Sequence, residues 1–174
     1  MKMNKKLAQL MNEQVNHERF NEAFYWSCAT YFDSLDLENI ATYFKLHALE
    51  ERSHAERFYN YLDDNGERVT IDAVKAPERD FKSMTHAFEL AVVAEEVTSE
   101  KIREMSKLAA NLEDHRASRF LREFELEQQE EEDLWNYNLS RAKLADGDKA
   151  ATLILDHEMA QREASGNKKF KCFK

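Results

Sequence analysis

The chain of 174 residues carries a formal net charge of -9, from 34 acidic and 25 basic side chains, and is 43% hydrophobic with only 3 glycines and 1 proline. This is the length of one domain with a sizeable core, and so few chain-breaking residues predict an all-α protein with long helices. The acidic balance argues against nucleic acid or an anionic membrane as the main partner, because both need surplus cations.

Heptad-like spacing of apolar residues divides the chain into five predicted helices and a tail. The helices are expected at about 4–33, 37–65, 81–111, 114–143 and 148–164. Gly66 and Gly147 follow the second and fourth helices as plausible stops. Residues 1–164 then form the domain, and the basic tail of residues 165–174 is expected to be poorly ordered.

The connection lengths predict the topology. The first and second helices, and the third and fourth, are joined by a few residues, so each pair should be antiparallel. The polar connection Glu67–Asp80, which contains Pro77, can reach roughly 45 Å when extended, whereas a helix of about 28 residues is roughly 42 Å long. The sequence therefore predicts a four-helix bundle with one long crossover between its second and third helices.

Each long helix has an inward stripe that is apolar near its ends and polar at its middle. The central residues of these stripes are Glu18, Glu51, His54, Glu95, Gln128 and Glu131. Side-by-side helices of similar length bring these residues to one level. Burying them without cations would cost several kcal/mol per charge, and no lysine or arginine lies in the stripes at this level. An oxygen-rich shell with one imidazole favours iron or manganese over structural zinc.

Other residues near these stripes have ordinary explanations. Glu51-x-x-His54 alone is a weak motif in a glutamate-rich chain. His47 is expected to be a buried core residue or a group behind the ligands, rather than a ligand. Tyr25 reads as a core aromatic and Cys28 as a small buried hydrophobe.

The cysteines and the N-terminus exclude several other classes. Cys28 and Cys172 are far apart and form no metal-ligand spacing, so a C-x-x-C electron-transfer or zinc module is not expected. No apolar run follows the basic segment Met1–Lys6, and no apolar stretch approaches the length of a membrane span. The expectation is a cytoplasmic protein.

Three segments give the chain a family resemblance. They are NEQVNHERF (12–20), HALEERSHAERF (47–58) and ELEQQEEE (125–132). With them the chain resembles the non-haem ferritins of prokaryotes, members of the 24-subunit ferritin family, from Asn4 to about Ala164. The resemblance implies a ferritin-like four-helix bundle with the long crossover and a short fifth helix.

The resemblance also implies a set of iron-binding roles. Glu18, Glu51 and His54 would hold one iron. Glu51 would bridge to a second iron, which Glu95 and Glu131 also hold. Gln128 would hydrogen-bond to ligands or bound oxygen species, and Tyr25 would lie beside the pair as a hydrogen-bonding or radical group. A third iron would be held by Glu50, Glu127 and Glu130, with Glu131 shared.

The implied activity is that of a ferroxidase, which oxidises Fe(II) to Fe(III) with O2 or H2O2 before mineral is deposited inside a cage of 24 copies. No haem is expected, because Arg52 stands where bacterioferritins have a haem-ligating methionine. The fourth helix carries Gln128-x-x-Glu131 in place of a second E-x-x-H, which also departs from bacterioferritins. The apolar stripe Leu153, Ile154 and Met159 of the fifth helix is expected to bury against a neighbouring subunit, with its own bundle as the alternative.

Two other functions stay open. A di-iron oxygenase or peroxidase acting on an organic substrate would need a cavity beside the metals, and Phe58, Phe88 and Phe124 make that less favourable. A metal-free helical interaction module would need partners for the central glutamates, and the sequence supplies none.

Overall fold

The computed structural model describes residues 3–164, and within this range it is helical with no strand. Its helices are α1 (Lys5–Asp33), α2 (Glu38–Asp64), α3 (Met84–Asn111), α4 (His115–Ala145) and α5 (Lys149–Ala164). The predicted all-α bundle is confirmed. The basic tail at residues 165–174, including Cys172, lies outside the described residues.

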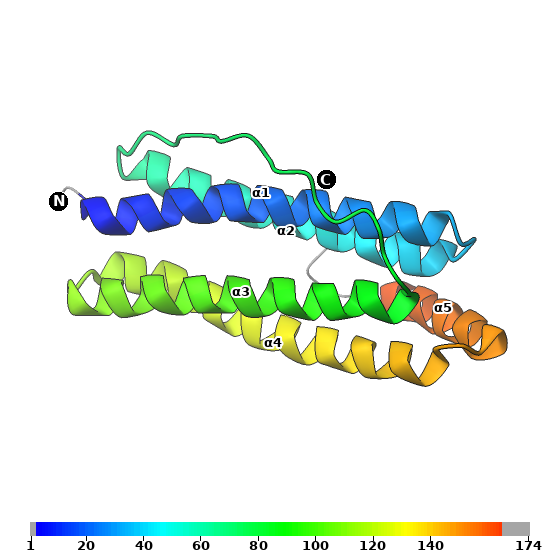
Figure 1. The fold of residues 1–174 in the computed structure, drawn as a ribbon. Helices are drawn as coiled ribbons and strands as arrows, with labels where there is room; N and C mark the ends of the chain where they lie inside the picture. Colours follow the sequence, from blue (N-terminus) through cyan, green and yellow to red (C-terminus); the bar gives the residue numbers. More distant parts are fainter. Residues whose placement is uncertain (1–2, 165–174) are drawn as a thin grey trace.

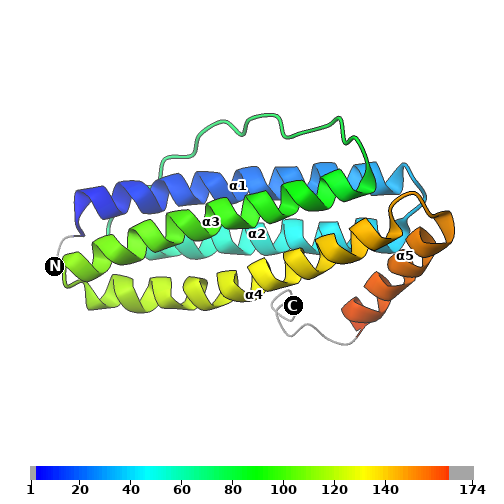
Figure 2. The ribbon, with the colours of Figure 1, turned by 60° about the horizontal axis from the view of Figure 1, so that its bottom comes forward.

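The four long helices lie side by side as one bundle (Figure 1). Short turns make α1 antiparallel to α2 and α3 antiparallel to α4, and α1–α2 and α3–α4 are the most extensive contacts. The segment between α2 and α3 runs along the outside of the bundle from one end to the other (Figures 1 and 2). The helices α2 and α3 are therefore parallel, as the length of the connection predicts.

Local sequence fixes the helix ends. The side chain of Asn4 accepts hydrogen bonds from the amides of Lys6 and Leu7 at 2.9 and 3.2 Å, which begins α1. The helix α3 begins at Met84 instead of about Phe81, because Ser83 Oγ accepts a hydrogen bond from the His86 amide at 3.1 Å. Gly66, at φ +75°, follows α2 in the left-handed conformation that glycine adopts without strain.

The crossover is held against α1 by side-chain hydrogen bonds to its backbone. Asn12 Nδ2 donates to the Thr70 carbonyl at 3.1 Å, and Asn12 Oδ1 accepts from the Thr70 amide at 2.7 Å. Arg19 donates to the Asp72 carbonyl at 2.8 Å. These bonds satisfy backbone groups that no helix or sheet would pair.

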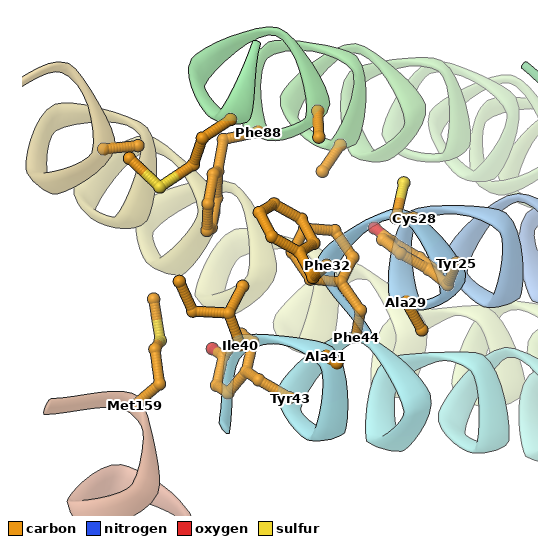
Figure 3. Close-up of a cluster of buried hydrophobic side chains, with 14 of the residues drawn as sticks. Tyr25, Cys28, Ala29, Phe32, Ile40, Ala41, Tyr43, Phe44, Phe88 and Met159 are labelled. Atoms are coloured by element: carbon orange, nitrogen blue, oxygen red, sulfur yellow. The ribbon is translucent and has the colours of Figure 1, made fainter. Parts of the chain in front are cut away.

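The apolar core consists of two clusters, one toward each end of the bundle. One contains Tyr25, Cys28, Phe32, Phe44 and Phe88, among others, and part of it is drawn in Figure 3. The other is built around Leu7, Met11, Phe58, Leu121 and Phe124. The polar residues that the sequence places at the helix midpoints lie between these clusters, so the apolar ends of the stripes stabilise the bundle on both sides of the polar level.

The short helix α5 packs on its own bundle, against α2 and α4. Leu155 and Met159 are buried in the core cluster, and Figure 3 shows Met159 beside Ile40. Met159 thus follows the alternative of packing on its own bundle. Leu153 and Ile154 are 63% and 59% exposed in the single chain. The stripe expected to act as one surface therefore divides into a buried and an exposed face.

A carboxylate of α5 caps α2. The helix α2 has no side-chain cap from its own N-cap residue, Leu37. Instead, Asp156 Oδ1 accepts hydrogen bonds from the amides of Asn39 and Ile40 at 3.1 and 2.9 Å, and Asp156 Oδ2 accepts one from Asn39 Nδ2 at 2.7 Å. These amides are the ones that an N-cap side chain ordinarily pairs.

Replacing Asp156 by alanine is expected to destabilise the bundle by about 2 kcal/mol, because two helix-terminal amides lose a charged acceptor. Faster amide hydrogen exchange confined to the first turn of α2 would locate the effect. Asp156→Asn, which retains the Oδ1 acceptor, is the matched control. Equal exchange rates in wild type and Asp156→Ala would rule out the capping role.

Candidate metal centre

Six polar side chains from four helices meet in the middle of the bundle. Each of them is at most 5% exposed, although the neighbouring layers are apolar. They are Glu18 on α1, Glu51 and His54 on α2, Glu95 on α3, and Gln128 and Glu131 on α4. The structure brings together all of the residues expected at the pair of irons.

Glu18, Glu51 and His54 form one group that could hold a metal ion. One ligand atom from each lies within 4.8 Å of the others, and His54 Nδ1 is 3.5 Å from Glu51 Oε2. Gln14 Nε2 donates a hydrogen bond to Glu18 Oε1 at 2.8 Å, whereas Glu18 Oε2 and Glu51 Oε2 are buried and accept no hydrogen bond. Glu18, with one oxygen oriented by Gln14 and the other without a hydrogen bond, is therefore arranged to receive a cation.

Glu95 is oriented by two neutral donors. The hydroxyl of Tyr25 donates a short hydrogen bond to Glu95 Oε1. Gln128 Nε2 donates to Glu95 Oε2 at 2.9 Å. Both residues thus hold a carboxylate in place, which is the kind of contact expected of Gln128 and Tyr25. The Tyr25 ring is itself stacked on Trp135, with ring centroids 5.4 Å apart.

The pKa values of the buried carboxyls and of His54 are shifted by burial and by one another. Burial, followed by the charge of Glu51, raises the pKa of Glu18, and burial followed by the charge of Glu95 raises the pKa of Glu51. Burial and the charge of Glu131 raise the pKa of Glu95. Burial alone would lower the pKa of His54, but Glu127 and Glu18 raise it to about 9. Burial and mutual repulsion therefore favour the protonated carboxyls, and a divalent cation competes with protons for the same oxygens.

The three glutamates expected at a third iron, Glu50, Glu127 and Glu130, have different surroundings in the structure. Arg57 Nη1 donates to Glu127 Oε2 at 2.7 Å, and His54 Nε2 is 3.5 Å from the same oxygen. Burial raises the pKa of Glu127, but His54 and Arg57 outweigh it and lower that pKa to about 2. Glu130 is exposed. Glu50 lies instead with Glu131 and His47, and one ligand atom from each of these three lies within 4.8 Å of the others.

His47 is not among the metal ligands that the sequence predicts. A signal was present, because His47-x-x-Glu50-Glu51-x-x-His54 reads the same in both directions. Residues three and four apart share a helix face, so this pattern places two carboxylates between two imidazoles along α2.

Comparison with known proteins agrees with this architecture. A four-helix bundle with one crossover and a central layer of carboxylates defines a class of metal-binding bundle proteins. The family model described as a ferritin-like domain matches residues 8–145. The chain belongs to the ferritin family, and this membership gives it a general role in iron storage.

Individual relatives support the assignment. The chain is 31% identical over 160 residues to a bacterial non-heme ferritin of Staphylococcus aureus (strain USA300), covering 92% of this chain and 96% of the relative. A bacterial non-heme ferritin of Staphylococcus epidermidis is 32% identical over 161 residues, with the same coverage. Among solved structures, an open pore ferritin from the archaeon Archaeoglobus fulgidus matches with a TM-score of 0.88 and 30% identity, over 91% of this chain and 98% of that one.

Among the described residues, no helix is both long and apolar enough to cross a membrane.

Proposed function

We propose that this chain is a ferroxidase that oxidises Fe(II) to Fe(III) at a pair of iron sites in the centre of its bundle. The observation that supports the proposal best is the convergence of Glu18, Glu51, His54, Glu95 and Glu131 in one buried layer, where Glu18 Oε2 and Glu51 Oε2 accept no hydrogen bond. Such a layer is costly without cations and suits a hard metal ion.

In this proposal Fe(II) is the substrate. Glu18, Glu51 and His54 receive one ion, and Glu95 and Glu131 receive the second with Glu51 between them. Metal binding requires the deprotonated carboxylates, so it competes with protons at these residues. Two Fe(II) ions give one electron each, and O2 takes up two electrons and two protons to become H2O2. When H2O2 is the oxidant, the same two electrons and two protons yield two waters. Carboxylate ligands favour this direction because they stabilise the harder Fe(III) product.

Storage further requires assembly, and we propose a cage of 24 copies in which the Fe(III) is deposited as mineral. Leu144, near the end of α4, and Leu153 and Ile154 of α5 are exposed in the single chain, so these apolar side chains are available to pack against a neighbouring copy. Net negative charge multiplied over many copies is tolerable around a cation-rich core.

The groove that comes near the centre does not favour an organic substrate. Its volume is about 310 Å³, and it reaches Gln128 between α3 and α4. Charged side chains such as Arg103, Arg122 and Glu132 line it, whereas sites for organic molecules are mostly apolar.

Counting iron per chain tests the proposal. After aerobic addition of excess Fe(II) and removal of unbound metal, we expect many irons per chain, retained in a particle with the mass of a large closed assembly. A plateau at two irons per chain would instead identify an oxygenase-type centre. No retained iron would identify a metal-free interaction module, and either result would overturn the storage function.

A further inference from the structure

We propose that Arg57 and Glu127 act together as positioning residues for His54, by holding its imidazole with Nδ1 directed at the candidate metal group. This inference rests on the proposed function, because it treats His54 as a ligand of the first iron. Neither Arg57 nor Glu127 supplies a ligand atom to that iron in this arrangement. Glu127 thereby receives a role that differs from the third-iron ligand implied by the family resemblance.

The two ring nitrogens of His54 face different carboxylates. Nδ1 is 3.5 Å from Glu51 Oε2, which belongs to the candidate metal group. Nε2 is 3.5 Å from Glu127 Oε2. This separation is longer than a typical hydrogen bond, and such bonds commonly shorten when a site binds its ligand. A histidine that binds metal through one ring nitrogen usually donates a hydrogen bond from the other, often to a carboxylate, which fixes the orientation of the ring. Glu127 occupies the position of that carboxylate.

Arg57 holds the Glu127 carboxylate in this position. Arg57 Nη1 donates a hydrogen bond at 2.7 Å to Glu127 Oε2, the same oxygen that faces His54. The side chains of Arg57 and Glu127 are 29% and 30% exposed, so the ion pair is partly shielded from water. A charge-assisted hydrogen bond of this length is among the stronger polar contacts in proteins. The direction of the oxygen toward His54 is therefore set by Arg57.

The ring of Phe124 supports both Arg57 and His54. Arg57 Cζ lies 3.9 Å from the centroid of the Phe124 ring, and the His54 ring meets the same ring edge to face, with centroids 5.6 Å apart. Phe124 is 1% exposed and belongs to one of the two apolar clusters. Because the guanidinium is planar and rigid, stacking on a buried ring restricts the directions of its N–H groups.

The spacing along two helices explains why these four side chains meet. His54 and Arg57 are three residues apart on α2, and Phe124 and Glu127 are three residues apart on α4. Residues three apart lie on the same face of a helix. Each helix therefore contributes two neighbouring side chains, and the contacts run from Arg57 on α2 to Glu127 on α4 and back to His54.

One substitution separates positioning from simple electrostatics by the sign of its effect. Removing the positive charge of Arg57 near a cation site would strengthen metal binding by Coulomb's law alone. Removing a group that positions a ligand weakens metal binding. Arg57→Ala is therefore diagnostic, whereas Glu127→Ala weakens binding on either account.

Titration of the full metal-free chain with Co(II), followed by its visible absorption, measures this effect without Fe(II) turnover. We expect Arg57→Ala and Glu127→Ala each to weaken Co(II) binding by about 10-fold or more, as groups that orient metal ligands typically do. The double variant should bind no more weakly than Glu127→Ala, because Arg57 acts through Glu127. Arg57→Lys should recover part of the affinity, since lysine can still pair with Glu127.

Glu123→Gln is the matched control. Glu123 Oε2 is 3.4 Å from Arg57 Nη2, but its side chain is 63% exposed. The variant removes a neighbouring carboxylate of Arg57 without removing Glu127, and it should bind Co(II) like the wild type.

The other outcomes decide against the proposal in different ways. A lower melting temperature of chelated Arg57→Ala with unchanged Co(II) affinity would overturn it, because the ion pair would then only join α2 to α4. Tighter binding or an additional cobalt per chain in Arg57→Ala would also overturn it, because Glu127 would then bind metal itself. In crystals of the Co(II)-loaded wild type, the metal should be bonded to His54 Nδ1. Its absence there would instead contradict the proposed function.

Discussion

Replacing Glu18 or His54 with alanine is expected to slow Fe(II) oxidation at least about 100-fold while the bundle remains folded. Even groups behind the ligands typically change metal affinity or activity by about 10- to 100-fold, and these two residues supply ligand atoms of the same group. Glu18→Ala should fold because removing a buried carboxylate that lacks a metal relieves a cost, and His54→Ala should fold because the apolar clusters on both sides of the polar layer remain intact. Both side chains lie between the two apolar clusters and are not part of either.

The measurement is the initial absorbance change of Fe(III) after rapid mixing of aerobic buffer with Fe(II)-loaded protein. Glu56→Ala and His115→Ala are matched controls, since both residues are exposed and outside the centre, and both should oxidise Fe(II) at the wild-type rate. Helical circular dichroism should be the same in all variants. Wild-type oxidation in Glu18→Ala or His54→Ala would refute the assignment of the pair.

The stability of the metal-free protein is expected to fall as pH rises, and bound metal should reverse that trend. The pKa values of Glu18, Glu51 and Glu95 are raised, first by burial and then by neighbouring carboxylates. Their contribution to stability is therefore fully present below the ordinary value of 4.5 and is lost as pH rises through their folded-state pKa values. The pKa of His54 is raised to about 9, so its contribution to stability also falls as the pH rises from about 6.5 to about 9. The pKa of Glu127 is lowered to about 2, so its contribution to stability changes only at pH values below this range.

Thermal unfolding in the presence of a chelator tests this. Between about pH 5.5 and about pH 8 the melting temperature should fall by about 5 °C, because one pKa unit corresponds to about 1.4 kcal/mol and 1 kcal/mol to about 2–4 °C in a chain of this size. The double variant Glu18→Gln, Glu51→Gln should show a smaller drop, to which His54 beside Glu127 still contributes. Zn(II) should raise the melting temperature more at pH 8 than at pH 5.5, since it binds the deprotonated carboxylates. A melting temperature of the chelated wild type that rises over this range would contradict the linkage.

The fold was predictable from the sequence because it depends on periodic, local information. The apolar stripes, the connection lengths and the position of Glu18, Glu51, Glu95 and Gln128 near the helix midpoints determine which residues meet. The start of α3 was misjudged because Ser83, a capping residue, outweighs the apolar Phe81. That competition is local and could have been recognised from the sequence.

The surroundings of the residues expected at a third iron were harder to predict from the sequence, because they depend on partners that are distant in the chain. Arg57 pairs with Glu127 across two helices, and no spacing rule connects them. The placement of His47 between Tyr43 and Trp135 likewise depends on how α2 and α4 pack. The division of α5 into a buried face with Met159 and an exposed face with Ile154 follows from its docking angle, which periodicity alone does not give.

The contact between Asp156 and the start of α2 has a consequence for the order in which a nascent chain matures. The acceptor for the Asn39 and Ile40 amides is made 117 and 116 residues after them. During synthesis α1 to α4 can emerge and associate while the first turn of α2 remains open to water, since domains fold as the ribosome delivers them. Only when α5 has left the ribosome does the carboxylate close that turn. The helix α5 thus completes the N-terminal cap of α2. A chain that ends before residue 156 has an uncapped first turn of α2, which is more open to proteases.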